Sequence, residues 1–163
     1  MKNLYKIFST ITIVSIVLLG YVIYNDNQFK NNDLSVKTIT KLKQKEYSLR
    51  KLILQKYNIE VNIPVIVSPK LKDNLFGIAA YNNGDIKIVL NKNRFQESED
   101  YMIDYVLPHE YAHALMFVFN DFPKENGGHS IRWQNICLSL DGKKCDRFVN
   151  HNDIVMGKLD FIY

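Results

Sequence analysis

Residues 107–113 read Leu-Pro-His-Glu-Tyr-Ala-His, which contains the pattern H-E-x-x-H at His109, Glu110 and His113. On an α-helix, residues four apart project from the same face, so two imidazoles at this spacing can bind one metal ion. A catalytic zinc site takes three protein ligands and keeps a fourth position open for water. The glutamate beside the first histidine is placed to accept a proton from that water. Because the chain has only four histidines, a chance match is improbable, and we predict a zinc site with Glu110 as general base.

The segments on both sides of this motif are strongly apolar, which predicts a buried helix. A dry environment of this kind strengthens the electrostatic interactions of Glu110 and of the metal. Ser98 is placed to cap the helix, and Pro108 is expected to kink or break it just before the first ligand. The apolar residues are Ile103, Val106, Leu107, Leu115, Met116, Val118 and Phe119.

The third ligand can be sought by elimination. A metzincin has another histidine six positions after the second ligand, where this chain has Phe119. A thermolysin-like site takes a glutamate from a following helix, but Asp121 and Glu125 lie close to the motif in a turn-rich stretch. His129 follows two glycines and opens a second apolar pattern with helical spacing, so it can fold back onto the first helix. We therefore predict His129 as the third ligand.

The combination of 109–113 with His129-Ser130-Ile131-Arg132-Trp133 resembles the SprT-like zinc metallopeptidases, whose pattern is H-E-x-x-H followed by H-G-x-x-W. Ser130 stands where the family usually has glycine, and a serine there can cap the second helix. Trp133 lies one turn beyond His129, where it is expected to pack behind the ligand. The resemblance implies an α+β, zincin-like minimal metallopeptidase, with a small, mostly antiparallel sheet packed by about three helices.

The segment before the motif supplies the expected sheet. Residues 35–57 have helical apolar spacing, and residues 60–68 predict a strand that tolerates an edge position. Residues 75–81 and 86–90 flank Asn82-Asn83-Gly84-Asp85, which predicts an antiparallel hairpin. Zinc peptidases of this kind align the substrate backbone along an exposed strand, and 86–90 is the candidate. The alternative is that 86–90 is simply a core strand.

The N-terminal segment predicts a membrane anchor. Residues 1–6 are basic, residues 7–24 are apolar and long enough to span a bilayer, and residues 25–34 are a polar linker to the metallopeptidase domain at 35–163. A cleaved signal peptide is the rival interpretation, but cleavage after Gly20 would put Leu18 where a small residue is preferred. The lysines before the span favour a cytoplasmic amino terminus. We therefore expect a single-pass membrane protein with an extracytoplasmic metal domain.

Two further features leave alternatives open. Basic residues are concentrated in the first helix of the domain, which predicts either an anionic partner or a solvated face. Nucleic-acid binding is unfavoured but not excluded, because no recognised motif accompanies the charge. Cys137 and Cys145, the only two cysteines, either form a disulfide or include a buried thiol at Cys137. The basic residues are Lys37, Lys41, Lys43, Lys45, Arg50, Lys51 and Lys56.

These observations favour a membrane-anchored, zinc-dependent endopeptidase that hydrolyses protein or peptide substrates. One alternative is an intracellular SprT-like protease that acts on DNA-associated proteins, although the sequence shows neither a zinc ribbon nor a basic tail. The other is an inactive binding module that zinc only stabilises. Substrate preference and oligomeric state are not predicted. The sequence does not rank the residues that would stabilise the oxyanion, which include Tyr81, Tyr111, Arg132 and His151.

Overall fold

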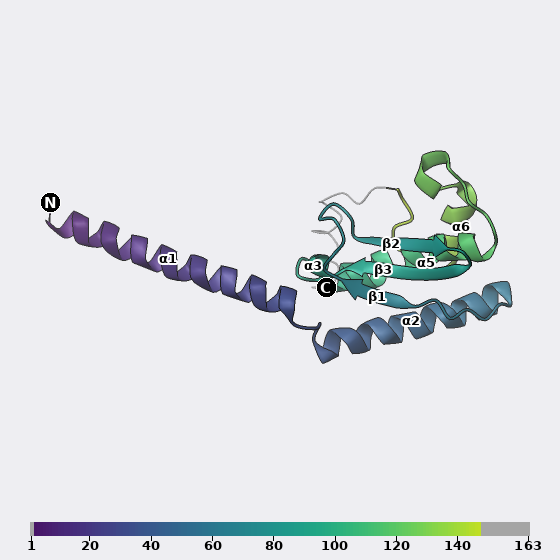
Figure 1. Ribbon diagram of the computed structural model, residues 1–163, viewed down its shortest axis with the longest axis horizontal. Coiled ribbons are helices and arrows are strands. Elements are labelled where there is room, and N and C mark those ends of the chain that lie inside the picture. Colours follow the sequence, from purple (N-terminus) through teal and green to yellow (C-terminus); the bar gives the residue numbers. More distant parts are fainter. Residues whose placement is uncertain (1, 148–163) are drawn as a thin grey trace. The chain divides into compact units, whose positions relative to one another are not determined.

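The computed structural model describes residues 2–147. The chain divides into two compact units, residues 1–34 and 35–163. His151 and the apolar tail from residue 154 lie outside the described residues, so the expectations for them are not addressed. The first unit contains α1 (Lys2–Asn31) and the second contains the sheet and the remaining helices (Figure 1).

Helix α1 is long and apolar enough to cross a membrane, a description that a signal sequence also satisfies. The helix includes the whole predicted span of residues 7–24 and continues through most of the expected polar linker. The continuation has a local cause, since side chains four residues apart pair along it. Lys30 forms a salt bridge of 2.7 Å with Asp26, and the Asn32 amide donates to Gln28.

The second unit holds a three-stranded sheet in the order β1-β3-β2, made of β1 (Val65–Ser68), β2 (Gly77–Asn82) and β3 (Asp85–Asn91). The predicted hairpin forms between β2 and β3, and its turn residues Asn83 and Gly84 have φ values of 49° and 98°. Strand β1 pairs in parallel with β3. The sheet is therefore mixed rather than mostly antiparallel, because β1 and β3 run in the same direction while β2 and β3 run in opposite directions.

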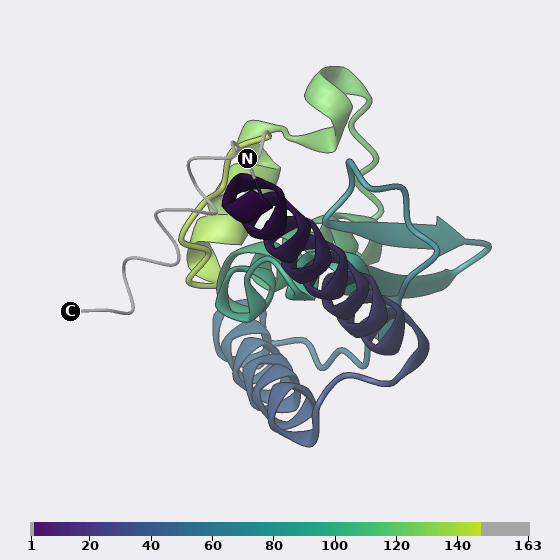
Figure 2. The same ribbon diagram turned by 90° about the vertical axis from the view of Figure 1, so that its left-hand side faces the viewer.

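The metal-motif helix packs against this sheet. Helix α5 (Leu107–Val118) contacts β2 and β3 on one side and α6 (Ile131–Ser139) on the other (Figure 2). Ile88 and Leu90 of β3, two residues apart and so on the same face of the sheet, are fully buried. Shorter elements connect these parts: α3 (Lys92–Phe95), α4 (Glu99–Tyr101), the π-helical turn η1 (Met102–Val106) and the 3₁₀ turn η2 (Glu125–Gly128).

Helix α2 (Val36–Tyr57) is the basic helix predicted at 35–57. Ser35 caps its first turn, and Asn58 ends it in the left-handed conformation with φ 53°. The apolar side chains on one face of the helix, including Leu49 and Ile53, are buried in the core. Several of its basic residues form salt bridges inside the unit: Lys41 with Glu99 and Asp100, Lys45 with Asp104, and Lys43 and Arg50 with Glu46.

Candidate metal centre

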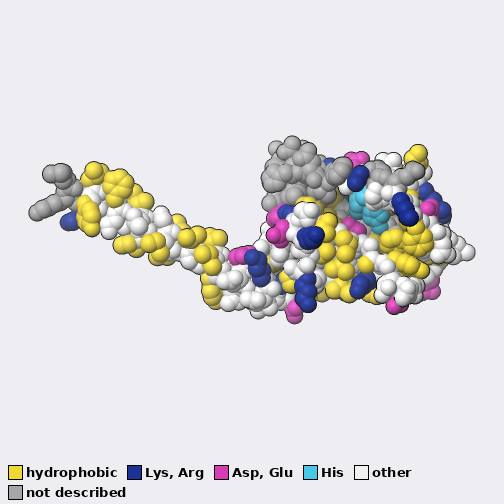
Figure 3. Space-filling model, turned by 45° about the horizontal axis from the view of Figure 1, so that its top comes forward, with side chains coloured by type: hydrophobic (Ala, Val, Ile, Leu, Met, Phe, Trp, Pro, Cys, Tyr) yellow, Lys and Arg dark blue, Asp and Glu magenta, His cyan; other side chains and the backbone are white. Residues whose placement is uncertain are grey.

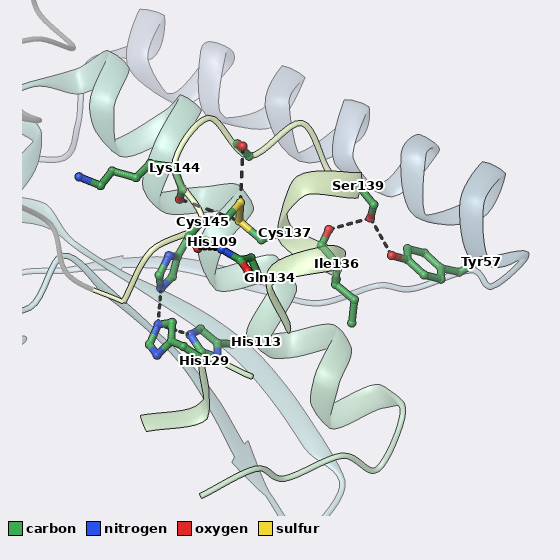
Figure 4. Close-up of a disulfide and its surroundings, with 11 residues drawn as sticks. Tyr57, His109, His113, His129, Gln134, Ile136, Cys137, Ser139, Lys144 and Cys145 are labelled. Carbon is green, nitrogen blue, oxygen red and sulfur yellow. Dashed lines mark hydrogen bonds between the residues drawn. A yellow bond between two sulfur atoms is a disulfide. The ribbon is translucent and has the colours of Figure 1, made fainter. Parts of the chain in front are cut away.

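The three predicted ligands converge on one point. His109 and His113 project from α5, and His129 projects from the segment between η2 and α6 (Figure 4). The Nε2 atom of His129 lies 3.1 Å from the Nε2 atoms of both His109 and His113. One nitrogen from each ring can be chosen so that all three lie within 4.8 Å of one another, an arrangement that can hold a metal ion.

The path into α5 explains how its histidines are aimed. Ser98 accepts a hydrogen bond from the Tyr101 amide and starts a helical path that reaches α5 through η1. The amide of Leu107 donates to the carbonyl of Met102, five residues earlier, which is the π-helical pattern. Pro108, which has no N–H, occupies the first turn of α5. The interruption expected at Pro108 is therefore a π-turn immediately before it.

The third ligand, His129, follows a tight loop that contains two glycines. Gly127 and Gly128 have φ values of 63° and 87°, which favour glycine. A Cβ atom on Gly128 would lie 3.5 Å from Cε1 of His113, so the loop backbone runs close to the second ligand. Ser130 then caps α6 by accepting a hydrogen bond of 3.2 Å from the Trp133 amide. Ser130 therefore acts as the predicted helix cap.

Trp133 packs against all three ligands. Its ring centroid lies 4.7 Å from that of His109, 5.0 Å from that of His113 and 4.4 Å from that of His129. The side chain is 1% exposed. Since the tryptophan contacts ligands from both segments, it fixes their relative orientation.

Burial sets the protonation of the ligands. Desolvation, with the charge of His129 as a smaller cause, lowers the pKa of His109 to about 4. Desolvation and the two neighbouring imidazoles lower the pKa of His113 to about 3. Both rings are therefore neutral at pH 7, which is the form that binds metal ions.

Glu110 lies beside the ligands but in a different environment. Its side chain is 6% exposed, and burial raises its pKa to about 8, although a backbone hydrogen bond from Ala79 acts in the opposite direction. Gly77 provides the space for this side chain, because a Cβ atom there would lie 2.9 Å from Cγ of Glu110. Strand β2 thus holds the carboxyl group in place, a contact that the sequence motif did not reveal.

The site opens into a cavity of about 940 Å³. His109, Glu110 and His113 line it together with residues of β2 and of the loop after α5. Figure 3 shows histidine side chains in a hollow of the surface, with hydrophobic side chains nearby. The cavity is large enough for a ligand of several residues.

The three described candidates for stabilising an oxyanion, Tyr81, Tyr111 and Arg132, do not line this cavity. Tyr111 has no exposed surface, and Arg132 pairs with Asp121 at 3.0 Å. Tyr81 packs against Phe117. None of the three lines the cavity, whereas Tyr105 does. Tyr105 was not among the predicted residues; it lies in η1, four residues before His109.

A disulfide connects Cys137 of α6 to Cys145, with the two Cα atoms 5.8 Å apart (Figure 4). The alternative of a buried thiol at Cys137 is therefore wrong. Gly142 allows the bridge to close, because a Cβ atom there would lie 2.6 Å from Sγ of Cys137 and 2.9 Å from Sγ of Cys145. The bridge ties the segment that carries Lys144, which lines the cavity, to the helix behind the ligands.

The donor set fits a divalent transition metal, because three imidazoles with a carboxyl group nearby are the ligands and base of known catalytic zinc sites. The model of the SprT-like family matches residues 23–151. No curated protein and no solved structure matches the chain. The family match includes both segments that carry the histidines, and the chain belongs to the SprT-like family.

Proposed function

We propose that this protein is a zinc-dependent endopeptidase, anchored in a membrane by α1, whose catalytic domain faces the extracytoplasmic side. The observation that carries the proposal is the convergence of His109, His113 and His129 beside the buried carboxyl of Glu110. Membership of the SprT-like family supports the same reaction class.

In this proposal, the three histidines bind zinc as neutral ligands and Trp133 keeps their rings oriented. Bound zinc supplies a Lewis acid that acidifies water and polarises the scissile carbonyl. Glu110 accepts the proton of the attacking water and passes it to the leaving amine. Burial raises the pKa of this carboxyl to about 8 in the metal-free chain, and the positive charge of bound zinc would favour the ionised form that accepts the proton. The hydrogen bond from Ala79 holds the carboxylate in place during both transfers.

The substrate backbone is aligned along β2 rather than β3. The prediction that residues 86–90 bind the substrate is wrong, because β3 is paired with β1 on one side and with β2 on the other. In the described residues, β2 pairs with β3 alone. The Asn91 amide bonds to the Phe76 carbonyl, so alternate residues from Gly77 onward turn their backbone groups away from β3. The Ala79 amide on this edge already donates to Glu110, and an extended substrate can add beside it through the other outward backbone groups of β2.

The location rests on two independent features. Helix α1 is long and apolar enough to span a membrane, and lysines precede it. The disulfide between Cys137 and Cys145 is of the kind that persists in oxidising compartments outside the cytoplasm. Together they support an anchored domain that acts on envelope or secreted proteins.

Replacement of Glu110 by glutamine tests the activity. The full chain in detergent should bind one equivalent of zinc in both forms, and the Glu110→Gln variant should lose at least a hundredfold in peptide cleavage. Glu60→Gln, an exposed glutamate outside the cavity, is the matched control and should keep full activity. If the wild-type protein binds zinc and cleaves nothing, the zinc-stabilised binding module replaces this proposal.

Paired carboxyl-terminal reporter fusions test the location. One reporter should be active only outside the cytoplasm and the other only inside. Activity of the inside reporter alone would contradict the proposed topology and would make the intracellular protease for DNA-associated proteins the leading hypothesis.

A further inference from the structure

Three aromatic side chains form a cluster at one end of the catalytic cavity. The ring centroids of Tyr81 and Phe117 are 5.8 Å apart, those of Tyr81 and Phe122 are 5.1 Å apart, and those of Phe117 and Phe122 are 5.5 Å apart. Despite these contacts, Tyr81 remains 43% exposed and Phe122 remains 47% exposed. The cluster therefore leaves a large apolar surface open to water, next to the metal centre.

The cluster is continuous with the site. Phe117 and Phe122 line the same cavity as His113 and Glu110, and Tyr81 packs against both aromatic rings from outside it. Phe117 lies four residues after His113 on α5, which is about 6 Å along the helix axis. Tyr81 lies two residues after Ala79, the partner of Glu110, which is about 7 Å along the strand.

The opposite end of the cavity differs. Its aromatic residues are less exposed than Tyr81 and Phe122. Tyr101 is 2% exposed and stacks on Tyr105, the guanidinium of Arg94 lies over Phe76, and both Tyr105 and Phe76 are half-buried. Phe122 is therefore the most exposed aromatic side chain among the described residues that line the cavity.

We propose that Tyr81, Phe117 and Phe122 form the specificity site of the peptidase, which takes a large apolar side chain of the substrate. An extended peptide advances about 3.3 Å per residue, so a distance of 6–7 Å places this side chain within two residues of the scissile bond. The inference rests on the proposed peptidase function and names its substrate class, which is peptides with an aromatic or large aliphatic residue at that position. Phe122, on the loop after α5, is the specificity-determining residue.

The first experiment identifies the position. The full-length protein, loaded with zinc and kept in detergent, is incubated with a library of proteome-derived peptides. The cleavage sites are then identified by mass spectrometry. Phenylalanine, tyrosine, leucine or methionine should be enriched at one position within two residues of the cleaved bond. Two synthetic peptides that differ only by phenylalanine or alanine at this position then give the preference, expected to be about tenfold to a hundredfold in kcat/KM.

The second experiment assigns the preference to the cluster. Phe122→Ala should reduce the preference for phenylalanine over alanine at least fivefold, mainly through kcat/KM of the phenylalanine peptide. Tyr47→Ala removes an aromatic side chain that is 66% exposed on α2 and should leave the preference unchanged. Phe122→Leu, which keeps apolar surface, should keep an intermediate preference. Equal zinc content in the variants shows that they are folded.

The possible failures are distinguishable. If the wild-type protein cleaves no peptide, the proposed function is wrong and this inference falls with it. If it cleaves peptides without an apolar preference, or if Phe122→Ala keeps the preference, the peptidase stands and the specificity site is overturned.

Discussion

The buried carboxyl of Glu110 should make the stability of the metal-free protein depend on pH. Its pKa rises from 4.5 in a solvated glutamate to about 8 in the folded chain, because burial disfavours the charged form. The stability that this group contributes is fully present below pH 4.5 and is lost as the pH rises through about 8. At neutral pH, the buried carboxyl of Glu110 therefore lowers the free energy of unfolding unless a cation lies nearby.

The size of the effect follows from the two pKa values. At about 1.4 kcal/mol per pKa unit, the penalty is about 1 kcal/mol at pH 5 and about 4 kcal/mol at pH 8. Replacing Glu110 by glutamine removes the titration, so the Glu110→Gln variant should gain about 3 kcal/mol relative to wild type between these pH values. The histidines change stability in the opposite direction, because their pKa values are lowered. Their contribution is common to both proteins and largely cancels in the difference.

Denaturant unfolding of the full chain in detergent with EDTA provides the assay. Trp133 is the only tryptophan and is buried against the ligands, so its fluorescence reports directly on this part of the fold. The same comparison with saturating zinc is the control, and there the pH dependence should shrink because the ionised carboxylate faces the metal. A difference between wild type and variant that stays constant from pH 5 to pH 8 without metal would refute the account of Glu110.

Three further predictions follow from close contacts. Gly77→Ala should push the side chain of Glu110 aside and lower kcat about tenfold to a hundredfold at unchanged zinc content, measured by peptide cleavage and metal analysis. Trp133→Phe removes part of the ring contact with the ligands and should weaken zinc binding about tenfold to a hundredfold, measured by competition with a chelator. Gly142→Ala places a methyl group against the disulfide and should cost about 1–3 kcal/mol of stability and raise the free-thiol content, measured by unfolding and thiol titration.

The features that the sequence predicted well depend on residues close together in the chain. The caps at Ser98 and Ser130, the turn at Asn83-Gly84 and the pairing of His109 with His113 on one face each involve no more than a few residues. Backbone preferences and helical spacing decide such features, so the printed sequence contains most of the information. To predict that His129 joins the other two ligands, one further inference was needed, namely that the two glycines before it turn the chain back toward α5.

The features that the sequence missed depend on which strands and side chains meet. The alternation in residues 86–90 is the same whether the strand lies at the edge or in the centre, so it did not reveal that β1 pairs in parallel with β3. The hydrogen bond from Ala79 to Glu110 likewise requires the position of β2 relative to α5. Two cysteines separated by eight residues are compatible with a bridge or with thiols, and only the turn around Gly142 decides between them.

The charge of α2 shows how tertiary pairing changes the meaning of a sequence pattern. Counted along the chain, its basic residues suggest a surface for an anionic partner. In the fold, Lys41 reaches Asp100, which is 59 residues away, and Lys45 reaches Asp104. Glu46 has only 2% of its side chain exposed and lies against Lys43 and Arg50, so a buried carboxylate requires part of this positive charge. An anionic ligand on α2 would therefore compete with the carboxylates of Glu99, Asp100 and Asp104, which join the helix to the elements leading into the metal centre. The basic residues of α2 thus serve first to hold the domain together.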